Sequence, residues 1–227
     1  QEFAEPALVE APTSGNLASF LLESEQPTPN GQAISIPTED GGWRHLTYSE
    51  FADSVRTMAR GIAASGVAVG DRVGIMSRTR YEWTLLDFAL WYAGAVPVPI
   101  YETSSAEQVE WILGDSGAVG VFLETDHHLS VFKDVQGSLP GVTRTWVIDQ
   151  GDLDAIAANA ADVSEEDLEA RRESVTPADI ATIIYTSGTT GRPKGCALTH
   201  SNLMFNVDAV VASLPEMFTD GNSTLLF

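Results

Sequence analysis

Residues 185–195 combine the side chains and backbone groups that bind phosphate. They read YTSGTTGRPKG and directly follow residues 181–184, an apolar run typical of a buried strand. Hydroxyl groups can donate hydrogen bonds to phosphate oxygens, glycines let backbone N–H groups come close, and Lys194 adds a mobile positive charge. The segment therefore predicts an anion-binding loop at the end of a strand.

The charge of the surrounding sequence supports an anion site. The chain has 227 residues, with 12 Lys and Arg against 32 Asp and Glu, which gives a formal net charge of −20. Residues 180–207 contain no Asp or Glu, and this longest acid-free run includes Lys194, one of two lysines in the chain. Because like charges near a bound anion are costly, an acidic protein must keep acidic residues away from such a site.

Other glycine-rich patterns fit this segment less well. Glycine and threonine alone are typical of a flexible surface loop, but the clustered hydroxyls, the lysine and the acid-free run favour a binding loop. The nucleotide-binding pattern G-x-x-x-x-G-K-[ST] fails because, counted from Gly188, its second glycine position holds Pro193. The dinucleotide pattern G-x-G-x-x-G fails because no such run follows a strand.

Alternating strands and helices are expected to position the loop. Apolar runs predict strands at residues 72–77, 95–100, 118–123 and 145–148, after a hairpin formed by residues 33–37 and 43–47. Helices are predicted at residues 16–24, 47–66, 82–93, 104–113 and 129–136, two of them with capping signals at residues 47–50 and 104–107. This alternation predicts an α/β fold in which a parallel sheet has helices on both faces.

We expect the chain to divide into two parts. Residues 1–30 are predicted to form an arm with one short helix, and residues 31–227 an incomplete N-terminal α/β body of a larger domain. Within the body, residues 151–177 carry eight acidic residues and predict a solvated helical connector with a cap at Ser164. The first residue is Gln1 and the last residues form an apolar run, so the chain is interpreted as a fragment.

Composition also limits the class of protein. The scarcity of Lys and Arg argues against a partner that is nucleic acid or an anionic membrane surface. The single cysteine cannot form an internal disulfide, and the most apolar stretch, residues 84–101, is broken by an aspartate and two prolines. The first basic residue is Arg44, so no signal peptide is indicated. We expect a cytoplasmic protein and leave peripheral membrane attachment open.

Residues 185–195 resemble the signature Y-T-S-G-T-T-G-x-P-K-G of the adenylate-forming (AMP-binding) superfamily, with a match at every specified position. The resemblance extends to residues 70–73, 91–99 and 108–113 upstream and to residues 198–203 downstream. Within the superfamily, residues 80–83 and 100–105 are most similar to those of bacterial long-chain fatty acyl-CoA ligases.

This resemblance implies an enzyme that uses ATP and Mg²⁺ to convert a carboxylate into an acyl-adenylate, with release of pyrophosphate, and then transfers the acyl group to coenzyme A. It implies that the loop holds the β- and γ-phosphates, that Thr186 also meets Mg²⁺, and that Arg192, at a variable position, faces solvent. The residues implied in the loop are Thr186, Ser187, Gly188, Thr189, Thr190, Gly191, Lys194 and Gly195.

The family's later segments, including its ribose-binding aspartate and its C-terminal catalytic lysine, do not occur in this sequence. We therefore expect the chain alone to be inactive, the fatty acid and coenzyme A to bind through missing parts, and the unfinished faces to self-associate. Two alternatives stay open: a fatty acyl-AMP ligase or other adenylate-forming enzyme, and a stand-alone phosphate- or nucleotide-binding module.

Four other residues are of types that can do chemistry, but we expect each of them to have a structural role. We expect His200 to be a helix-start residue near the sheet edge rather than a general base, since no carboxylate lies nearby in sequence. Cys196 is expected to be a small buried residue in the strand after the loop. His127 and His128 are expected to form a surface pair at a helix start rather than a metal site, because adjacent helical positions diverge.

Overall fold

A four-stranded parallel sheet with the strand order β4-β3-β5-β6 forms the centre of the protein. The computed structural model describes residues 8–186 and 192–218. The central strands are β3 (Arg72–Met76), β4 (Val96–Ile100), β5 (Gly120–Leu123) and β6 (Arg144–Val147). Two antiparallel pairs accompany them: β1 (Gln32–Pro37) with β2 (Trp43–Thr47), and β7 (Ile180–Thr186) with β8 (Lys194–Thr199), called the ribbon below.

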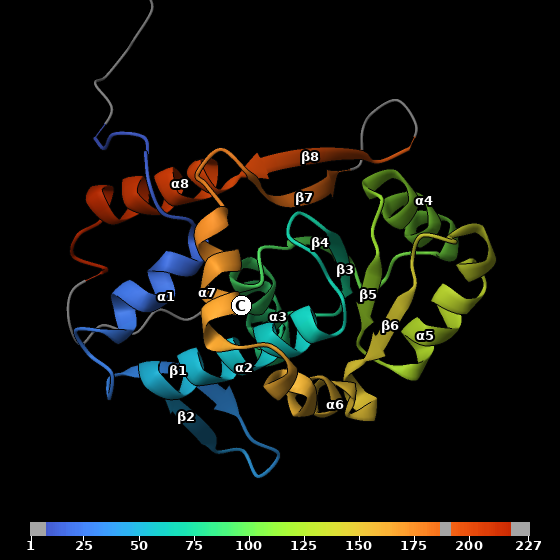
Figure 1. Ribbon diagram of the computed structural model, residues 1–227, viewed down its shortest axis with the longest axis horizontal. Helices are drawn as coiled ribbons and strands as arrows, with labels where there is room; N and C mark the ends of the chain where they lie inside the picture. The colour runs from blue at the N-terminus through green and yellow to red at the C-terminus, as the bar shows by residue number, and fades with distance from the viewer. Residues whose placement is uncertain (1–7, 187–191, 219–227) are drawn as a thin grey trace, which may run out of the picture.

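Helices cover both faces of the parallel sheet, which confirms the predicted α/β fold (Figure 1). On one face lie α2 (Tyr48–Ala64) and α3 (Tyr81–Tyr92); on the other lie α4 (Ala106–Ser116) and α5 (Asp126–Lys133). The remaining helices are α1 (Leu17–Glu25), α6 (Asp152–Ala158), α7 (Glu165–Ser174) and α8 (His200–Ser213), with 3₁₀ turns at Gln136–Ser138, Ile148–Gln150 and Asn159–Asp162. Among the described residues, no helix has both the length and the hydrophobicity needed to cross a membrane.

Capping boxes mark the starts of α1, α2, α4, α5 and α8. The Thr47 hydroxyl accepts the backbone N–H of Glu50 at 3.2 Å, and the Glu50 carboxylate accepts the Thr47 N–H at 2.8 Å. Each box satisfies backbone donors that the helix itself leaves unpaired. Helix α5 starts three residues earlier than predicted from 129, because Thr125 forms such a box with His128.

The sequence of β4 explains why the parallel sheet ends at this strand. The backbone N–H of Val96 donates to Asp71 O at 2.8 Å, on the β3 side. Alternation along a strand therefore directs the nitrogens of Pro97 and Pro99 to the free edge, where neither has a hydrogen to donate. The ribbon meets this edge through a side chain, since the Thr182 hydroxyl donates to Pro97 O at 2.9 Å.

The N-terminal helix is fixed between α7 and α8. The Asn16 side-chain amide donates to the carbonyls of Arg172 at 2.8 Å and Val175 at 3.0 Å, at the end of α7. The backbone N–H of Leu17 donates to Nδ1 of His200, the first residue of α8, at 3.1 Å. One short helix thus connects the segments on both sides of the ribbon.

The prediction that residues 151–177 form a solvated connector is wrong for their inner face. Leu153, Ile156 and Leu168 are 8%, 3% and 1% exposed and belong to the core that includes α2 and α3. Contact with α2 is close, because a Cβ atom built on Gly61 would lie 2.1 Å from the Ile156 carbonyl oxygen. The run of charged residues indicated only the solvent-exposed side of this segment, which carries most of its acidic residues.

We predict that Gly61→Ala destabilises the protein. An alanine inside a helix normally gains about 1 kcal/mol over glycine, but here its Cβ would strike backbone, so a net loss of about 1–3 kcal/mol in unfolding free energy is expected. The matched control is Gly114→Ala in α4, where the nearest atom is Leu139 Cδ2 at 3.5 Å. Denaturant unfolding should show this control gaining stability, and the same gain at Gly61 would contradict the α2–α6 contact.

We also predict that His200 makes stability depend on pH. Burial lowers its pKa from 6.5 to about 4, although the Asp179 charge acts in the opposite direction. The unfolded chain therefore takes up this proton first, so the contribution is complete above pH 6.5 and is lost as the pH falls to about 4. Urea unfolding should show a loss up to about 3 kcal/mol larger than in His200→Asn, which keeps an acceptor for Leu17 but does not titrate. Parallel pH curves would contradict the assignment.

Candidate functional site

The ribbon brings the two ends of the predicted phosphate loop together. Thr186 is paired with Lys194, and Tyr185 with Gly195, in the antiparallel register of β7 and β8. Thr186 and Lys194 are both exposed, at the end of the ribbon. This end of the ribbon lies beside α4 (Figure 1). The predicted residues between them, Ser187, Gly188, Thr189, Thr190 and Gly191, lie outside the described residues.

Helix α4 contacts the chain on both sides of this loop, called its two limbs below: residues 185–186 before the loop and residues 192–194 after it. Trp111 Nε1 donates to the Pro193 carbonyl oxygen at 2.7 Å. The Arg192 guanidinium carbon lies 4.7 Å from the centroid of the Trp111 ring, a cation–π arrangement. One turn along the helix, the Asp115 carboxylate accepts the hydroxyl of Tyr185 at 2.6 Å. Arg192 is exposed as expected, and its aromatic partner was not foreseen from the sequence.

Tyr185 forms the inner wall of the ribbon end. Its side chain packs in the apolar cluster formed by β5, α4 and α5, and the residue is 6% exposed. Burial, followed by the bond to the Asp115 carboxylate, raises the Tyr185 pKa, so the hydroxyl keeps its proton and donates. Its partner Gly195 provides room, because a Cβ there would lie 3.0 Å from Tyr185 Cζ.

Acidic residues lie near the loop in space although none lies near it in sequence. A hollow of about 350 Å³ beside the ribbon is lined by residues that include Glu107, Glu110, Asp115 and Arg192. Within the part of the chain that the structure describes, no carboxylate lies within 4.0 Å of the Lys194 ammonium group. The ribbon itself thus carries no acidic residue, while α4 places three of them around the hollow that Arg192 also lines.

The exposed hydroxyl at the ribbon end is compatible with a magnesium ion that is held mainly through its phosphate ligand. Among the described residues, no group of three or more His, Cys, Asp and Glu side chains could hold a metal. Mg²⁺ commonly keeps several waters and uses one or two protein groups together with substrate phosphates. The exposed Thr186 hydroxyl fits the part of one such protein group.

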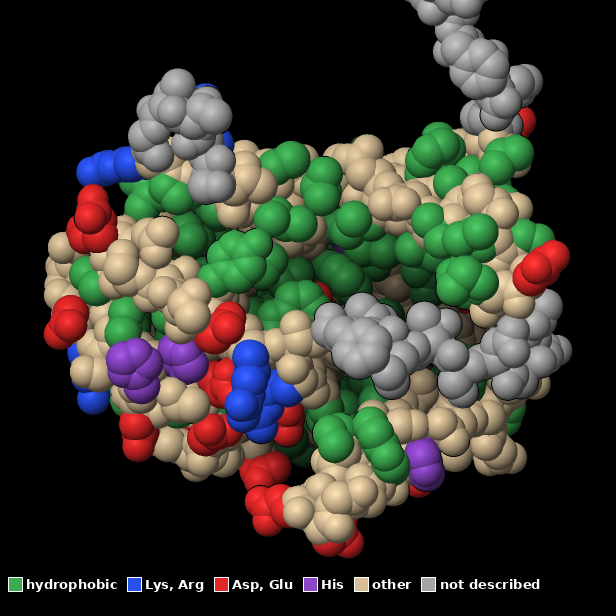
Figure 2. Space-filling model, turned by 180° about the vertical axis from the view of Figure 1, so that it is seen from behind, with side chains coloured by type: hydrophobic (Ala, Val, Ile, Leu, Met, Phe, Trp, Pro, Cys, Tyr) green, Lys and Arg blue, Asp and Glu red, His purple; other side chains and the backbone are tan. Residues whose placement is uncertain are grey.

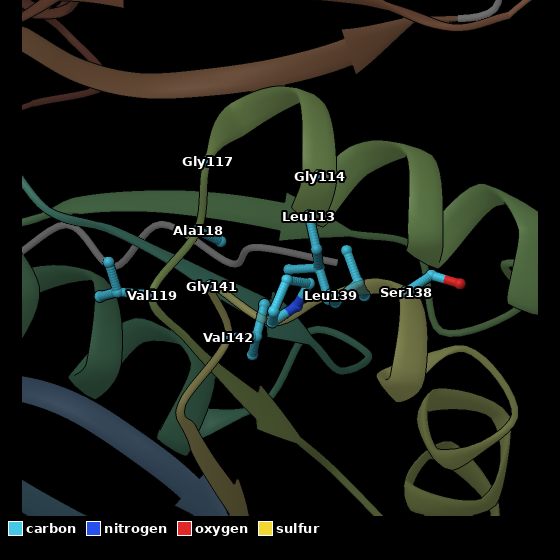
Figure 3. Close-up of a pocket in the computed structure, with 10 residues that line it drawn as sticks. Leu113, Gly114, Gly117, Ala118, Val119, Ser138, Leu139, Gly141 and Val142 are labelled. Atoms are coloured by element: carbon cyan, nitrogen blue, oxygen red, sulfur yellow. The ribbon is translucent and has the colours of Figure 1, made fainter.

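A second hollow lies below the C-terminal end of α4 and has a volume of about 260 Å³. Figure 3 shows Leu113, Leu139 and Val142 close together within it, where α4 approaches residues 138–142. Its lining contains glycines and aliphatic side chains, with Ser138 as the hydroxyl-bearing residue and no titratable group. This hollow offers packing space and no reactive group.

Two predictions about single residues are corrected by the structure. Cys196 is exposed rather than buried, because the outer face of β8 is not covered by any part of the described chain. His128 is 7% exposed rather than on the surface: its Nδ1 lies 3.0 Å from the Thr125 hydroxyl and its Nε2 lies 3.1 Å from the Glu102 carbonyl. His127, beside it, is exposed as expected.

His200 behaves as the structural helix-start residue that was predicted. It is the first residue of α8 and is 2% exposed. Its Nδ1 is occupied by the Leu17 N–H, and its backbone N–H donates to the Asp179 carbonyl oxygen at 3.0 Å. Nδ1 of His200 already accepts this hydrogen bond, so it is not free to accept a proton from a substrate.

An ionic cluster that the sequence did not reveal lies at the carboxyl ends of β3 and β5. Glu124, whose side chain is 3% exposed, receives Arg78 Nε at 2.7 Å and Arg80 at 3.3 Å. Arg80 also contacts Glu82 at 2.6 Å and Asp149 at 2.8 Å. Chains leave β3 and β5 toward opposite faces, and open α/β sheets often bind ligands at such a point. Here mutual ion pairs fill it.

Comparison with known proteins places these features in one family. The model of the family described as AMP-binding enzyme matches residues 23–226. A long-chain-fatty-acid–CoA ligase, FadD15, from Mycobacterium bovis is 43% identical over 230 residues, which cover 100% of this chain and 38% of that relative. A feruloyl-CoA synthase from Amycolatopsis sp. is 34% identical over 84% of this chain and 34% of its own length. The chain therefore spans little more than a third of these curated relatives.

Solved structures show the same fold. A long-chain-fatty-acid-CoA ligase (FadD1) from Archaeoglobus fulgidus superposes with a TM-score of 0.78 at 27% identity, over 94% of this chain and 42% of that one. The structure of VinN with 3-methylaspartate gives a TM-score of 0.72 at 22% identity, over 91% of this chain and 53% of that one, and so supports the fold alone. Because the family model spans nearly the whole chain, and residues at both ends of the loop signature are paired in the ribbon, this chain belongs to the AMP-binding enzyme family.

Proposed function

We propose that the protein to which this chain belongs is an ATP-dependent long-chain fatty acyl-CoA ligase. The observation that carries the proposal is the 43% identity to a long-chain-fatty-acid–CoA ligase along the entire chain, signature loop included. In the first step, a carboxylate oxygen of the fatty acid attacks the α-phosphorus of ATP and pyrophosphate leaves. In the second step, the coenzyme A sulfur attacks the acyl carbonyl carbon and AMP leaves.

In this proposal the ribbon end holds the pyrophosphate side of ATP. Lys194 neutralises negative charge on the β- and γ-phosphates, and Thr186 donates to a phosphate oxygen and meets Mg²⁺. The hydroxyls of Ser187, Thr189 and Thr190 add donors, while Gly188 and Gly191 let backbone N–H groups approach. Support comes from the pairing of Thr186 with Lys194, which sets two exposed polar groups at the two ends of the loop.

We also propose that this chain self-associates when it is separated from the rest of the protein. Apolar side chains gather on the face that carries α8 and around the hollow beside it (Figure 2). The exposed large apolar residues of α8 and the segment after it are Phe205, Val207, Val210, Val211, Leu214, Met217 and Phe218. A contiguous exposed apolar surface of this kind favours association.

The proposed role of Lys194 predicts a large kinetic effect in the full-length protein. Lys194→Ala should slow ATP-dependent acyl-adenylate formation at least about tenfold, because a positive charge aimed at a transferring phosphate contributes several kcal/mol. The matched control is Lys133→Ala, which removes the other lysine, exposed at the end of α5. Pyrophosphate release with palmitate measures both rates, and wild-type rates in Lys194→Ala would remove the loop from the mechanism.

The proposed substrate class predicts a selectivity for long aliphatic carboxylates over amino acids. ATP–pyrophosphate exchange should be stimulated by palmitate and similar acids in the full-length protein. A panel of fatty acids, aromatic acids and amino acids at equal concentration measures the preference. Exchange stimulated by an amino acid but not by palmitate would overturn the proposal and leave the family assignment intact.

A further inference from the structure

We infer that Trp111 and Asp115 are positioning residues for phosphate binding: each fixes one limb of the loop to helix α4. The inference rests on the proposed function and deepens it, since neither residue belongs to the loop signature. The two positions are four residues apart on an eleven-residue helix, so they lie on one face, one turn from each other. Helix α4 packs through Val109, Ile112 and Leu113 on the parallel sheet. Both limbs are therefore attached to the same packed helix.

The limb after the loop is fixed through its backbone. Trp111 Nε1 donates to Pro193 O at 2.7 Å, and this oxygen belongs to the same planar peptide unit as the Lys194 nitrogen. Pro193 itself has a nearly fixed φ angle and no N–H. The bond therefore fixes the orientation of the peptide plane that contains the backbone nitrogen of Lys194. The Arg192 guanidinium on the face of the Trp111 ring adds a second contact at the same place.

The limb before the loop is fixed through a side chain. The Tyr185 hydroxyl donates to Asp115 Oδ2 at 2.6 Å, which holds the Tyr185 ring on the α4 side of the ribbon. Successive strand residues point to opposite faces, so Thr186 is directed away from α4. Gly195 permits this arrangement, because a side chain there would crowd the Tyr185 ring at 3.0 Å.

Both polar groups of the proposed site therefore follow directly after an anchored residue. Thr186 follows Tyr185, Lys194 follows Pro193, and the two anchors lie one turn apart on α4. Groups that bind and orient a reacting phosphate must be held to within a fraction of an ångström to about one ångström. Loss of either anchor should weaken the use of MgATP without changing the binding of the carboxylate.

The first test removes one hydrogen bond and keeps an aromatic ring. Trp111→Phe in the full-length protein loses the Nε1 donor but leaves a ring beneath Arg192, and the half-buried position tolerates the smaller side chain. In ATP–pyrophosphate exchange with palmitate, the KM for MgATP should rise about two- to tenfold, the range set by one net hydrogen bond. The KM for palmitate should stay unchanged, and the melting temperature should fall by no more than the few degrees expected for one hydrogen bond. The control is Trp43→Phe, since Trp43 is 56% exposed on the β1–β2 hairpin.

The second test uses a double-mutant cycle at the other limb. Tyr185→Phe and Asp115→Ala should each raise the KM for MgATP, and the double variant should be no worse than either one, because both break the same bond. Asp115→Asn keeps a side-chain oxygen that can accept the Tyr185 hydroxyl and should restore a nearly wild-type KM. Additive effects, or failure of the asparagine to rescue, would overturn the role of Asp115.

The outcomes separate this inference from the function on which it rests. If Lys194→Ala abolishes acyl-adenylate formation while Trp111→Phe leaves the KM for MgATP unchanged, the positioning role falls and the proposed function stands. If Trp111→Phe lowers the melting temperature by more than these few degrees and raises both KM values together, Trp111 has only a general structural role and the inference also falls. If no carboxylate supports exchange in the wild-type protein, the proposed function itself falls.

Discussion

The attachment of the ribbon to the parallel sheet is the interaction on which the rest of the site depends. Pro97 and Pro99 leave the edge of β4 without backbone donors, so side chains make the hydrogen bonds between the ribbon and the body described here. At the start of β7, Trp91 Nε1 donates to Ala181 O at 2.8 Å and the Thr182 hydroxyl donates to β4. At the far end, α4 holds both limbs of the loop. An attachment through side chains depends on which residues are present, whereas a ladder of backbone hydrogen bonds does not.

The N-terminal helix stabilises the opposite end of the same ribbon. Asn16 donates to the end of α7 just before β7, and His200, which accepts from Leu17, starts α8 just after β8. The segment that precedes β7 and the residue that follows β8 are therefore both hydrogen-bonded to the start of α1. Since a buried imidazole that accepts a backbone N–H must stay neutral, this arrangement favours the folded protein at neutral pH. The boundary at residue 30 stays a prediction, although α1 itself packs against α2, α3 and α8.

Local sequence signals were enough to predict most helices and strands. They failed for burial and for contacts, which depend on residues far away in the sequence. Thr47 and Ser105 start helices because their capping partners lie three residues away in sequence. The predicted burial of Cys196 is wrong because its residue type and its place in a strand do not show whether anything covers that face of the strand. The hydrogen bonds of Trp111 and Asp115 could not be predicted, because their partners are 82 and 70 residues away in sequence. The loop residues 187–191 and their roles stay predictions.

Charge placement makes the proposed phosphate site compatible with a net charge of −20. Arginines of the body are engaged locally: Arg56 with Glu25, and Arg172 with Glu169, in ion pairs of 2.8 and 2.7 Å. Lys194, in contrast, has no such pair among the described residues, so an incoming phosphate need not compete with a carboxylate for it. At physiological ionic strength, exposed charges more than about 8 Å away are largely screened. The distant acidic residues therefore act weakly at the ribbon end, where the local charge is set by Lys194 and Arg192 together with the nearby carboxylates of α4.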